Sequence, residues 1–394
     1  MEQEGVNNYT KVCVTGGSGY IGSFLVKKLL QKGYTVHATL RNLDEKPKVE
    51  LLRSLPNADT RLVLFQADIY NPTEFEPAIR GCQYVFHVAT PMQHDSQSSQ
   101  YKDTSEAAIA SARIIANSCV RSQTVKRLIY TASVTSSSPL KEDGSGYEPS
   151  FNESSWTSLN LSYTFSNDFF LAYIKSKTLA EKEVLSYNEI ENSKLEVVSL
   201  ACALVGGDTL LSYFPAASSL AVIISQLTGN LSYYAGLRFL QELLGSVPLL
   251  HIDDVCEAHI FCMEKESLRG RFLCSAVDPT IQEISNYYQE NYPQLKITPD
   301  SVIHLGIAVS KFDFERRSVI HLHGFGTLRL LRSEVLKESF KIYCAINDGI
   351  INLVDKFFEM PRHEAMKALD IYKRSGQQET KMGFYCLTPP PTKQ

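Results

Sequence analysis

The stretch TGGSGYIG, from Thr15 to Gly22, decides the fold of this 394-residue chain. Its glycines Gly16, Gly19 and Gly22 recur at every third position, between a short apolar β run and a segment with helical apolar spacing. Small residues there let the backbone approach a pyrophosphate, and the amino terminus of the following helix stabilises negative charge. Because the pattern opens a series of alternating strands and helices, it predicts a dinucleotide-binding loop rather than a glycine-rich turn without a ligand.

The first 200 residues alternate strand and helix patterns. We expect strands at residues 11–15, 35–40, 61–65, 84–88, 126–131 and 195–200, and helices at 20–32, 103–121 and 170–187. Strands separated by helices predict an α/β fold, a doubly wound parallel sheet of the NAD(P)-binding Rossmann type. From residue 201 to about residue 297, helix and loop patterns dominate, as in a smaller C-terminal substrate lobe.

Three regions follow from this alternation. We expect an NADP-binding Rossmann domain at residues 8–200, a substrate-binding lobe at 201–300 and a divergent C-terminal tail at 301–394. The loop 134–170 could belong to the lobe, since a loop of that length in a compact domain is usually functional. In the tail, apolar residues at helical spacing predict one or two helices near 331–359, and polar composition predicts disorder from about Arg374 onward.

The composition excludes several classes of protein. There are 39 Lys and Arg against 43 Asp and Glu, a formal net charge of −4, which suits neither nucleic acid nor an anionic membrane as partner. No apolar run approaches the length of a membrane span, and the polar, acidic start lacks the features of a signal peptide. Nine cysteines without a Cys-x-x-Cys pair predict reduced thiols, a cytoplasmic location and no metal site. The oligomeric state stays open, with a monomer among the options.

The end of the second expected strand indicates which dinucleotide binds. An acid there holds the ribose 2′-hydroxyl of NAD, whereas an arginine accepts the 2′-phosphate of NADP. The strand ends in Arg41 with no acid before Asp44, and Lys48 adds charge, so NADP is favoured. Asp68 and Ile69 follow the third strand, where the adenine edge is contacted, although Asp68 could equally cap a helix.

The segment Tyr173-Ile-Lys-Ser-Lys177 is the strongest catalytic candidate. A helix places residues four apart on one face, and a nearby ammonium lowers the pKa of a phenol, which makes it a better proton donor. Alone, this pattern is common and usually marks a solvated helix face. Ser133 ends the preceding strand and could hydrogen-bond a substrate carbonyl, with Thr131 and Thr135 as rivals and local backbone capping as the alternative.

These motifs together resemble the extended short-chain dehydrogenase/reductase family. The similarity is narrowest to the plant dihydroflavonol reductase group, above all to its anthocyanidin reductase and NADPH-dependent HC-toxin reductase types. It rests on NESSW, SKTLAEK, GSVPLLHIDDVCEAHIFCMEKES, LVLFQADIY and HVATPMQHD, and runs from about residue 11 to 299. Ala201 stands where many relatives have a proline, and from residue 301 the chain departs from the pattern of these relatives.

The resemblance implies an NADP-dependent oxidoreductase. Hydride would pass from NADPH to a small-molecule carbonyl or conjugated system, flavonoid-like or HC-toxin-like. Tyr173 would donate the proton, Lys177 would lower its pKa and bind the nicotinamide ribose, and Ser133 would orient the carbonyl. The expected cofactor contacts are Gly16, Gly19, Tyr20, Ile21, Gly22, Arg41, Lys48, Asp68, Ile69, Val88, Ala89, Thr90, Tyr173 and Lys177. Two alternatives remain, an epimerase or dehydratase on the same scaffold and a non-catalytic NADP(H)-binding protein.

Overall fold

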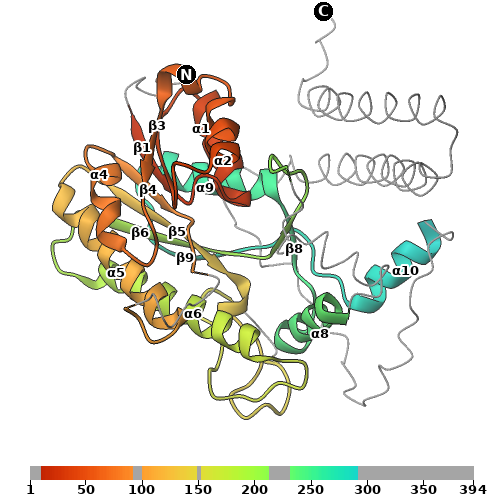
Figure 1. Ribbon diagram of the computed structural model, residues 1–394. Helices are drawn as coiled ribbons and strands as arrows, with labels where there is room; N and C mark the ends of the chain where they lie inside the picture. Colours follow the sequence, from red (N-terminus) through yellow and green to blue (C-terminus); the bar gives the residue numbers. More distant parts are fainter. Residues whose placement is uncertain (1–9, 92–99, 149–151, 213–230, 292–394) are drawn as a thin grey trace, which may run out of the picture. The chain divides into compact units, whose positions relative to one another are not determined.

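The structure is a computed structural model that describes residues 10–91, 100–148, 152–212 and 231–291 (Figure 1). The chain divides into two compact units, Met1–Ile320 and His321–Gln394, and every described residue belongs to the first. The tail at 301–394, with its expected helices near 331–359 and its expected disorder, lies outside the described residues.

A seven-stranded sheet forms the centre of the described unit. The strand order is β3-β2-β1-β4-β5-β6-β9, and every neighbouring pair is parallel. The strands are β1 (Lys11–Thr15), β2 (Thr35–Leu40), β3 (Leu62–Gln66), β4 (Tyr84–His87), β5 (Arg127–Ser133), β6 (Glu196–Cys202) and β9 (Gly270–Cys274). The Rossmann sheet is confirmed, and the six strands expected from the sequence lie within two residues of their expected bounds. The order reverses between β1 and β4, and ligands of such sheets bind at this switch point, beyond the carboxyl ends of the strands.

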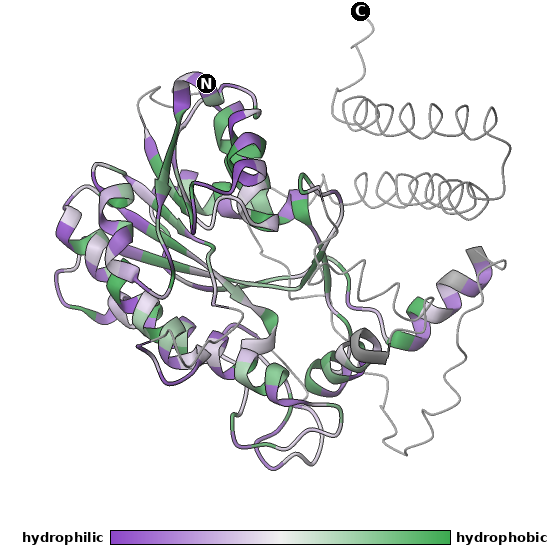
Figure 2. Ribbon diagram, in the orientation of Figure 1, coloured by the Kyte–Doolittle hydropathy of each residue, from purple (hydrophilic) through white to green (hydrophobic). Residues whose placement is uncertain are grey.

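Helices cover both faces of the sheet (Figure 1). Along β1 the side chains alternate, so Val12 and Val14 pack into one buried cluster and Cys13 into the other. The first cluster holds α1 (Tyr20–Gln31), α2 (Lys46–Arg53) and α9 (Ile252–Glu264), and the second holds α4 (Glu76–Ile79), α5 (Thr104–Ser122) and α6 (Asp168–Leu185). The hydrophobic residues that Figure 2 shows along the strands therefore face helices on both sides. Among the described residues, none of the helices combines the length and the apolar character needed to cross a membrane.

The chain beyond residue 200 contributes more to the sheet than its sequence pattern indicates. The strand β9 adds a seventh, outermost strand beside β6, and α9 packs on α1, where Lys28 Nζ lies 2.7 Å from both Asp253 and Glu257. Two further strands, β7 (Leu204–Gly206) and β8 (Leu249–His251), form a separate parallel pair. Sequence reading missed these strands because each is three to five residues long and the longest, GRFLC, carries a charged Arg271.

The helix α8 (Leu231–Leu244) contacts the described parts of the loop 134–170. Later in the chain comes the helix α10 (Ile281–Asn291). The hydroxyl of Tyr147 donates to the carbonyl of Glu242 at 2.7 Å, and the Glu242 carboxylate accepts from the amide of Thr164 at 2.6 Å. The rings of Phe170 and Phe239 stack with centroids 5.0 Å apart. These contacts support a role of the loop in the lobe that contains α8.

Seven cysteines lie within the described residues, and all of them are buried: Cys13, Cys82, Cys119, Cys202, Cys256, Cys262 and Cys274.

Candidate active site

The glycine-rich loop joins β1 to α1 with very little space around its backbone. Gly16 has φ +67°, a conformation that glycine adopts without strain. A Cβ on Gly22 would lie 2.1 Å from the carbonyl oxygen of Gly16, and one on Gly16 would lie 3.2 Å from Ala89. Gly19 precedes α1 as its N-cap, and no side chain caps the helix there. A close-packed glycine cradle facing a helix end without a side-chain cap fits the pyrophosphate of a dinucleotide.

The two residues expected at the adenosine end of the cofactor lie together. Arg41 Nε is 3.8 Å from Asp68 Oδ2, and the Arg41 side chain is 70% exposed, so its guanidinium is accessible to an incoming phosphate. Asp68 Oδ1 also accepts from the amide of Tyr70 at 3.0 Å, a contact within its own turn. Lys48 pairs with Glu45 at 2.5 Å, in the turn before its helix, so much of its charge is already balanced.

The hydroxyl of Thr15 connects the ends of β1 and β4. It accepts from the amides of Val88 and Ala89, both at 3.0 Å, and lies 3.0 Å from His87 Nδ1. Burial lowers the pKa of His87 to about 3, so the ring is neutral. Because the Thr15 oxygen already accepts from two amides, its hydroxyl proton is left for His87 Nδ1. This role of Thr15 was missed from the sequence.

Ile69 is buried in the core, where it supports the site by packing.

Ser133, Tyr173 and Lys177 meet at the carboxyl end of β5. The side chain of Tyr173, from α6, interacts with that of Ser133, which ends β5. One turn further along α6, Lys177 Nζ donates to Thr90 Oγ1 at 2.8 Å and to the carbonyl of Thr131 at 3.0 Å. The structure thus brings together the candidate catalytic residues and Thr90, which was expected beside the cofactor.

The two rival hydroxyls have other partners. Thr131 Oγ1 lies 2.8 Å from Nε2 of the buried His259, and the hydroxyl of Thr135 donates to Ser133 Oγ at 2.9 Å. Ser133 is therefore the hydroxyl that contacts Tyr173, and Thr135 helps to orient it.

The pKa of Tyr173 differs in direction from the expectation. Burial raises it, and the interaction with Ser133 opposes that rise only in part. Tyr173 consequently keeps its proton at neutral pH. Burial also lowers the pKa of Lys177 to about 8, and its ammonium is turned toward Thr90 and the Thr131 carbonyl. That Lys177 lowers the pKa of Tyr173 stays a prediction.

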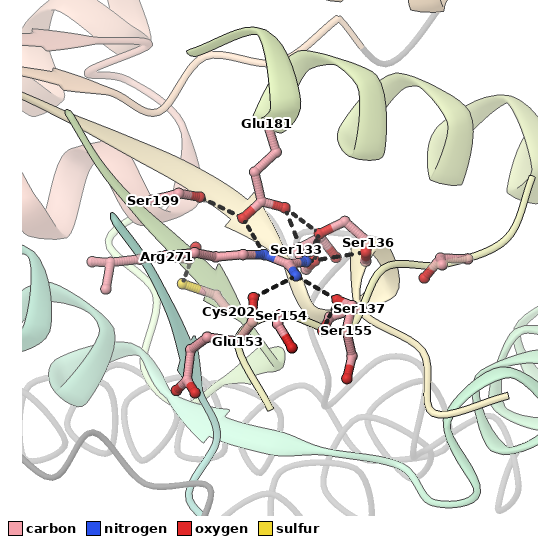
Figure 3. A network of polar contacts seen from close by, with 12 residues as sticks. Ser133, Ser136, Ser137, Glu153, Ser154, Ser155, Glu181, Ser199, Cys202 and Arg271 are labelled. Carbon is pink, nitrogen blue, oxygen red and sulfur yellow. Dashed lines mark hydrogen bonds and ion pairs between the residues drawn. The ribbon is translucent and has the colours of Figure 1, made fainter. Parts of the chain in front are cut away.

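A buried ion pair next to these residues was missed from the sequence (Figure 3). Glu181, four residues after Lys177 on α6, is fully buried, and its Oε1 accepts from Arg271 Nε of β9 at 2.9 Å. Ser199 Oγ donates to the same carboxylate at 2.6 Å, and Ser136 Oγ donates to its other oxygen. The spacing of Lys177 and Glu181 in SKTLAEK was an available signal, but the partner 90 residues away on β9 was not. Within the described ranges, no group of three or more His, Cys, Asp or Glu side chains could hold a metal ion.

Comparison with known proteins places the chain among reductases. An anthocyanidin reductase of Arabidopsis thaliana is 33% identical over 347 residues, covering 88% of this chain and 94% of the relative. A dihydroflavonol 4-reductase of Gerbera hybrida is 36% identical over 289 residues, 73% of this chain and 74% of the relative. The crystal structure of vestitone reductase from alfalfa (Medicago sativa) superposes with a TM-score of 0.57 at 32% identity, covering 73% of this chain and 83% of that one.

The Arabidopsis alignment spans 347 of the 394 residues, so it extends past residue 301 wherever it begins. The divergence of the tail at 301–394 stays a prediction. A family model for the ANTH domain matches residues 333–385, beyond the described residues.

The family model described as "NAD dependent epimerase/dehydratase family" matches residues 12–272. This range includes the glycine-rich loop, the Ser133, Tyr173 and Lys177 group, and the seven-stranded sheet except its first residue and its last two. The chain therefore belongs to the NAD dependent epimerase/dehydratase family, the extended short-chain dehydrogenases/reductases.

Proposed function

We propose that this chain is an NADPH-dependent reductase that reduces a carbonyl or conjugated system of a flavonoid-like small molecule. The observation that carries the proposal is the grouping of Ser133, Tyr173 and Lys177 at the end of β5, where Tyr173 interacts with Ser133 and Lys177 Nζ donates to the Thr131 carbonyl one helical turn away. This set lies at the carboxyl edge of the sheet, where β1 also delivers the glycine-rich loop.

Each residue has a role that follows from its surroundings. The glycine-rich loop and Arg41 would hold the pyrophosphate and the 2′-phosphate of NADPH, which supplies a hydride when bound. Tyr173 holds a proton at its hydroxyl oxygen and donates it to the substrate oxygen. Ser133, beside Tyr173, orients that oxygen, and Lys177 provides positive charge and ribose contact beside them.

The aromatic residues near Ser133 and Tyr173 favour a flat, aromatic substrate. Val134 and Ile174, the neighbours of Ser133 and Tyr173 in the chain, pack in one buried cluster with Tyr163 and Phe239. Rings of this kind bind other rings by stacking or edge contacts. The relatives named above reduce an anthocyanidin, a dihydroflavonol and vestitone according to their names, which supports the same substrate class.

The test is oxidation of NADPH by the purified protein with a panel of flavonoids, cinnamoyl derivatives and cyclic-peptide ketones. We expect turnover with a flavonoid-type member of the panel. Binding of NADPH without turnover of any member would favour the non-catalytic alternative. Isomerisation or dehydration of a substrate with the nucleotide retained would favour the epimerase or dehydratase alternative. The cytoplasmic location and the oligomeric state stay predictions, to be tested by cell fractionation and light scattering.

A further inference from the structure

The Glu181–Arg271 pair lies at the junction of several segments that carry the candidate active site (Figure 3). Arg271 contacts both carboxylate oxygens of Glu181, through Nε at 2.9 Å and Nη2 at 3.3 Å. The two side chains are 0% and 5% exposed. Ser199 of β6 donates to the same carboxylate at 2.6 Å. One carboxylate thus ties α6 to β6 and β9.

The same pair also holds the turn that follows Ser133. Arg271 Nη2 donates to the Ser136 carbonyl at 3.0 Å and lies 3.1 Å from Ser136 Oγ, which in turn donates to Glu181. The hydroxyl of Ser136 also lies 2.7 Å from the Ser133 carbonyl, in the short helix η2 (Val134–Ser136). The turn that carries Ser133 is therefore fixed to α6 through Glu181 and to β9 through Arg271.

The remaining donors of Arg271 fix a fifth segment, the loop near residue 155. Arg271 Nη1 donates to the carbonyls of Glu153 and Ser155. Its guanidinium carbon lies 3.8 Å from the centre of the Trp156 ring, the only tryptophan of the chain. Five of the segments around the site thus depend on one charged pair.

Stability alone does not explain a charged pair at this place. Removing two charges from water is unfavourable, and apolar residues of similar volume often stabilise a core as well or better. An ion pair with directional hydrogen bonds fixes the geometry of the segments that it joins, whereas an apolar pair does not. Tyr173, Lys177 and Glu181 follow one another at intervals of four residues, so they share one face of α6.

We propose that Glu181 and Arg271 are positioning residues, which hold the Ser133 turn against the Tyr173 and Lys177 face of α6 and so set the position of Ser133 relative to Tyr173. As a role in catalysis, this rests on the proposed function. As a statement about geometry, it is testable without turnover.

A second ion pair of the same fold provides a matched control. Arg127 and Glu196 begin β5 and β6, the strands that Ser133 and Cys202 end, and their side chains are 2% and 14% exposed. Arg127 Nε donates to Glu196 Oε2 at 2.8 Å. This pair joins the same two strands at the opposite edge of the sheet, so its loss reports on stability alone.

The experiment compares Glu181→Gln with Glu196→Gln. The kcat for NADPH oxidation, the Kd of NADPH and the thermal midpoint are measured, together with the NMR resonance of 13C-labelled Tyr173, assigned through its absence in Tyr173→Phe. We expect Glu181→Gln to lower kcat by about 10- to 100-fold, the scale of a misplaced reacting group, with little change in the Kd of NADPH. Its Tyr173 resonance shifts and its Trp156 fluorescence changes. Glu196→Gln leaves kcat and the Tyr173 resonance unchanged.

A Glu181→Gln protein that loses stability but keeps the wild-type kcat and Tyr173 resonance would overturn the proposal. If the wild-type protein turns over no substrate, the proposed function fails, while the Tyr173 resonance still decides the positioning role. If Glu181→Gln does not fold, Ser136→Ala replaces it, because it keeps the ion pair and removes the hydroxyl between that pair and the turn. A shifted Tyr173 resonance is expected there too, and an unshifted one would count against the proposal.

Discussion

Arg41→Asp reverses the charge that we expect to bind the 2′-phosphate of NADPH. Arg41 ends β2, and its guanidinium lies 3.8 Å from Asp68. In the variant, two carboxylates would face each other at that position. A phosphate arriving there would meet negative charge in place of a hydrogen-bonding cation.

The size of the effect follows from the exposure of this residue. A hydrogen bond to a charged group contributes about 1.5–3 kcal/mol, which corresponds to roughly 10- to 150-fold in affinity. Because Arg41 is 70% exposed, solvent and salt screen its charge, and we expect a loss of NADPH affinity in the lower half of that range at physiological salt. The exposed Arg41–Asp68 pair itself contributes only about 0–1 kcal/mol to folding, so the thermal midpoint should hardly change.

The assay is kcat/KM for NADPH and for NADH, measured at low and at high salt. We expect the wild-type protein to prefer NADPH and Arg41→Asp to lose that preference, mainly through KM, with the smaller difference at high salt. Lys175→Asp is the matched control, since Lys175 is 50% exposed and lies 3.4 Å from an acid, Asp103. Equal kcat/KM for both cofactors in the wild-type protein would refute the reasoning, as would an equal loss for NADPH and NADH in the variant.

Three further changes test the rest of the site. Tyr173→Phe should lower the reduction rate by about 10²–10⁴-fold and leave NADPH binding intact by calorimetry, since only the proton donor is removed; full activity would refute its role. Lys177→Met should damage both NADPH binding and rate. Burial lowers the pKa of Lys177 to about 8, so its ammonium loses its proton as the pH rises above that value. The rate of the wild-type protein should therefore fall above about pH 8, and a constant rate through this range would contradict the assignment. Gly22→Ala places a Cβ 2.1 Å from the Gly16 carbonyl oxygen. We expect it to lower the free energy of unfolding by about 1–3 kcal/mol and to weaken NADPH binding. An unchanged thermal midpoint and Kd would show that the loop shifts to accommodate the methyl group.

The sequence predicted the parts of the fold that depend on local patterns. The loop at Gly16–Gly22 and the six strands that follow the alternation are found within two residues of their expected bounds. Ser133, Tyr173 and Lys177 could be selected because helix periodicity and strand ends fix where such residues lie.

What sequence reading missed depends on contacts between distant segments. The strand β9 is short and contains the charged Arg271, so its sequence alone does not indicate a buried strand. Only the fold places Glu181 beside Arg271. The direction of the Tyr173 pKa depends on burial under the neighbouring segments, which spacing along one helix does not reveal. Thr15 looked like the last residue of a strand, yet its hydroxyl holds the end of β4.

The buried cysteine thiols can report how the layers on the two sides of the sheet open. Burial raises the pKa of the Cys82 and Cys262 thiols to about 12, so neither is a reactive thiolate in the folded protein. Cys82 belongs to one side of the sheet and Cys262 to the other. An alkylating reagent reaches either thiol only when the layer above it separates, and the modification rate then reports the free energy of that local opening. Mass spectrometry of partly labelled protein would thus show which layer separates first, without any added probe.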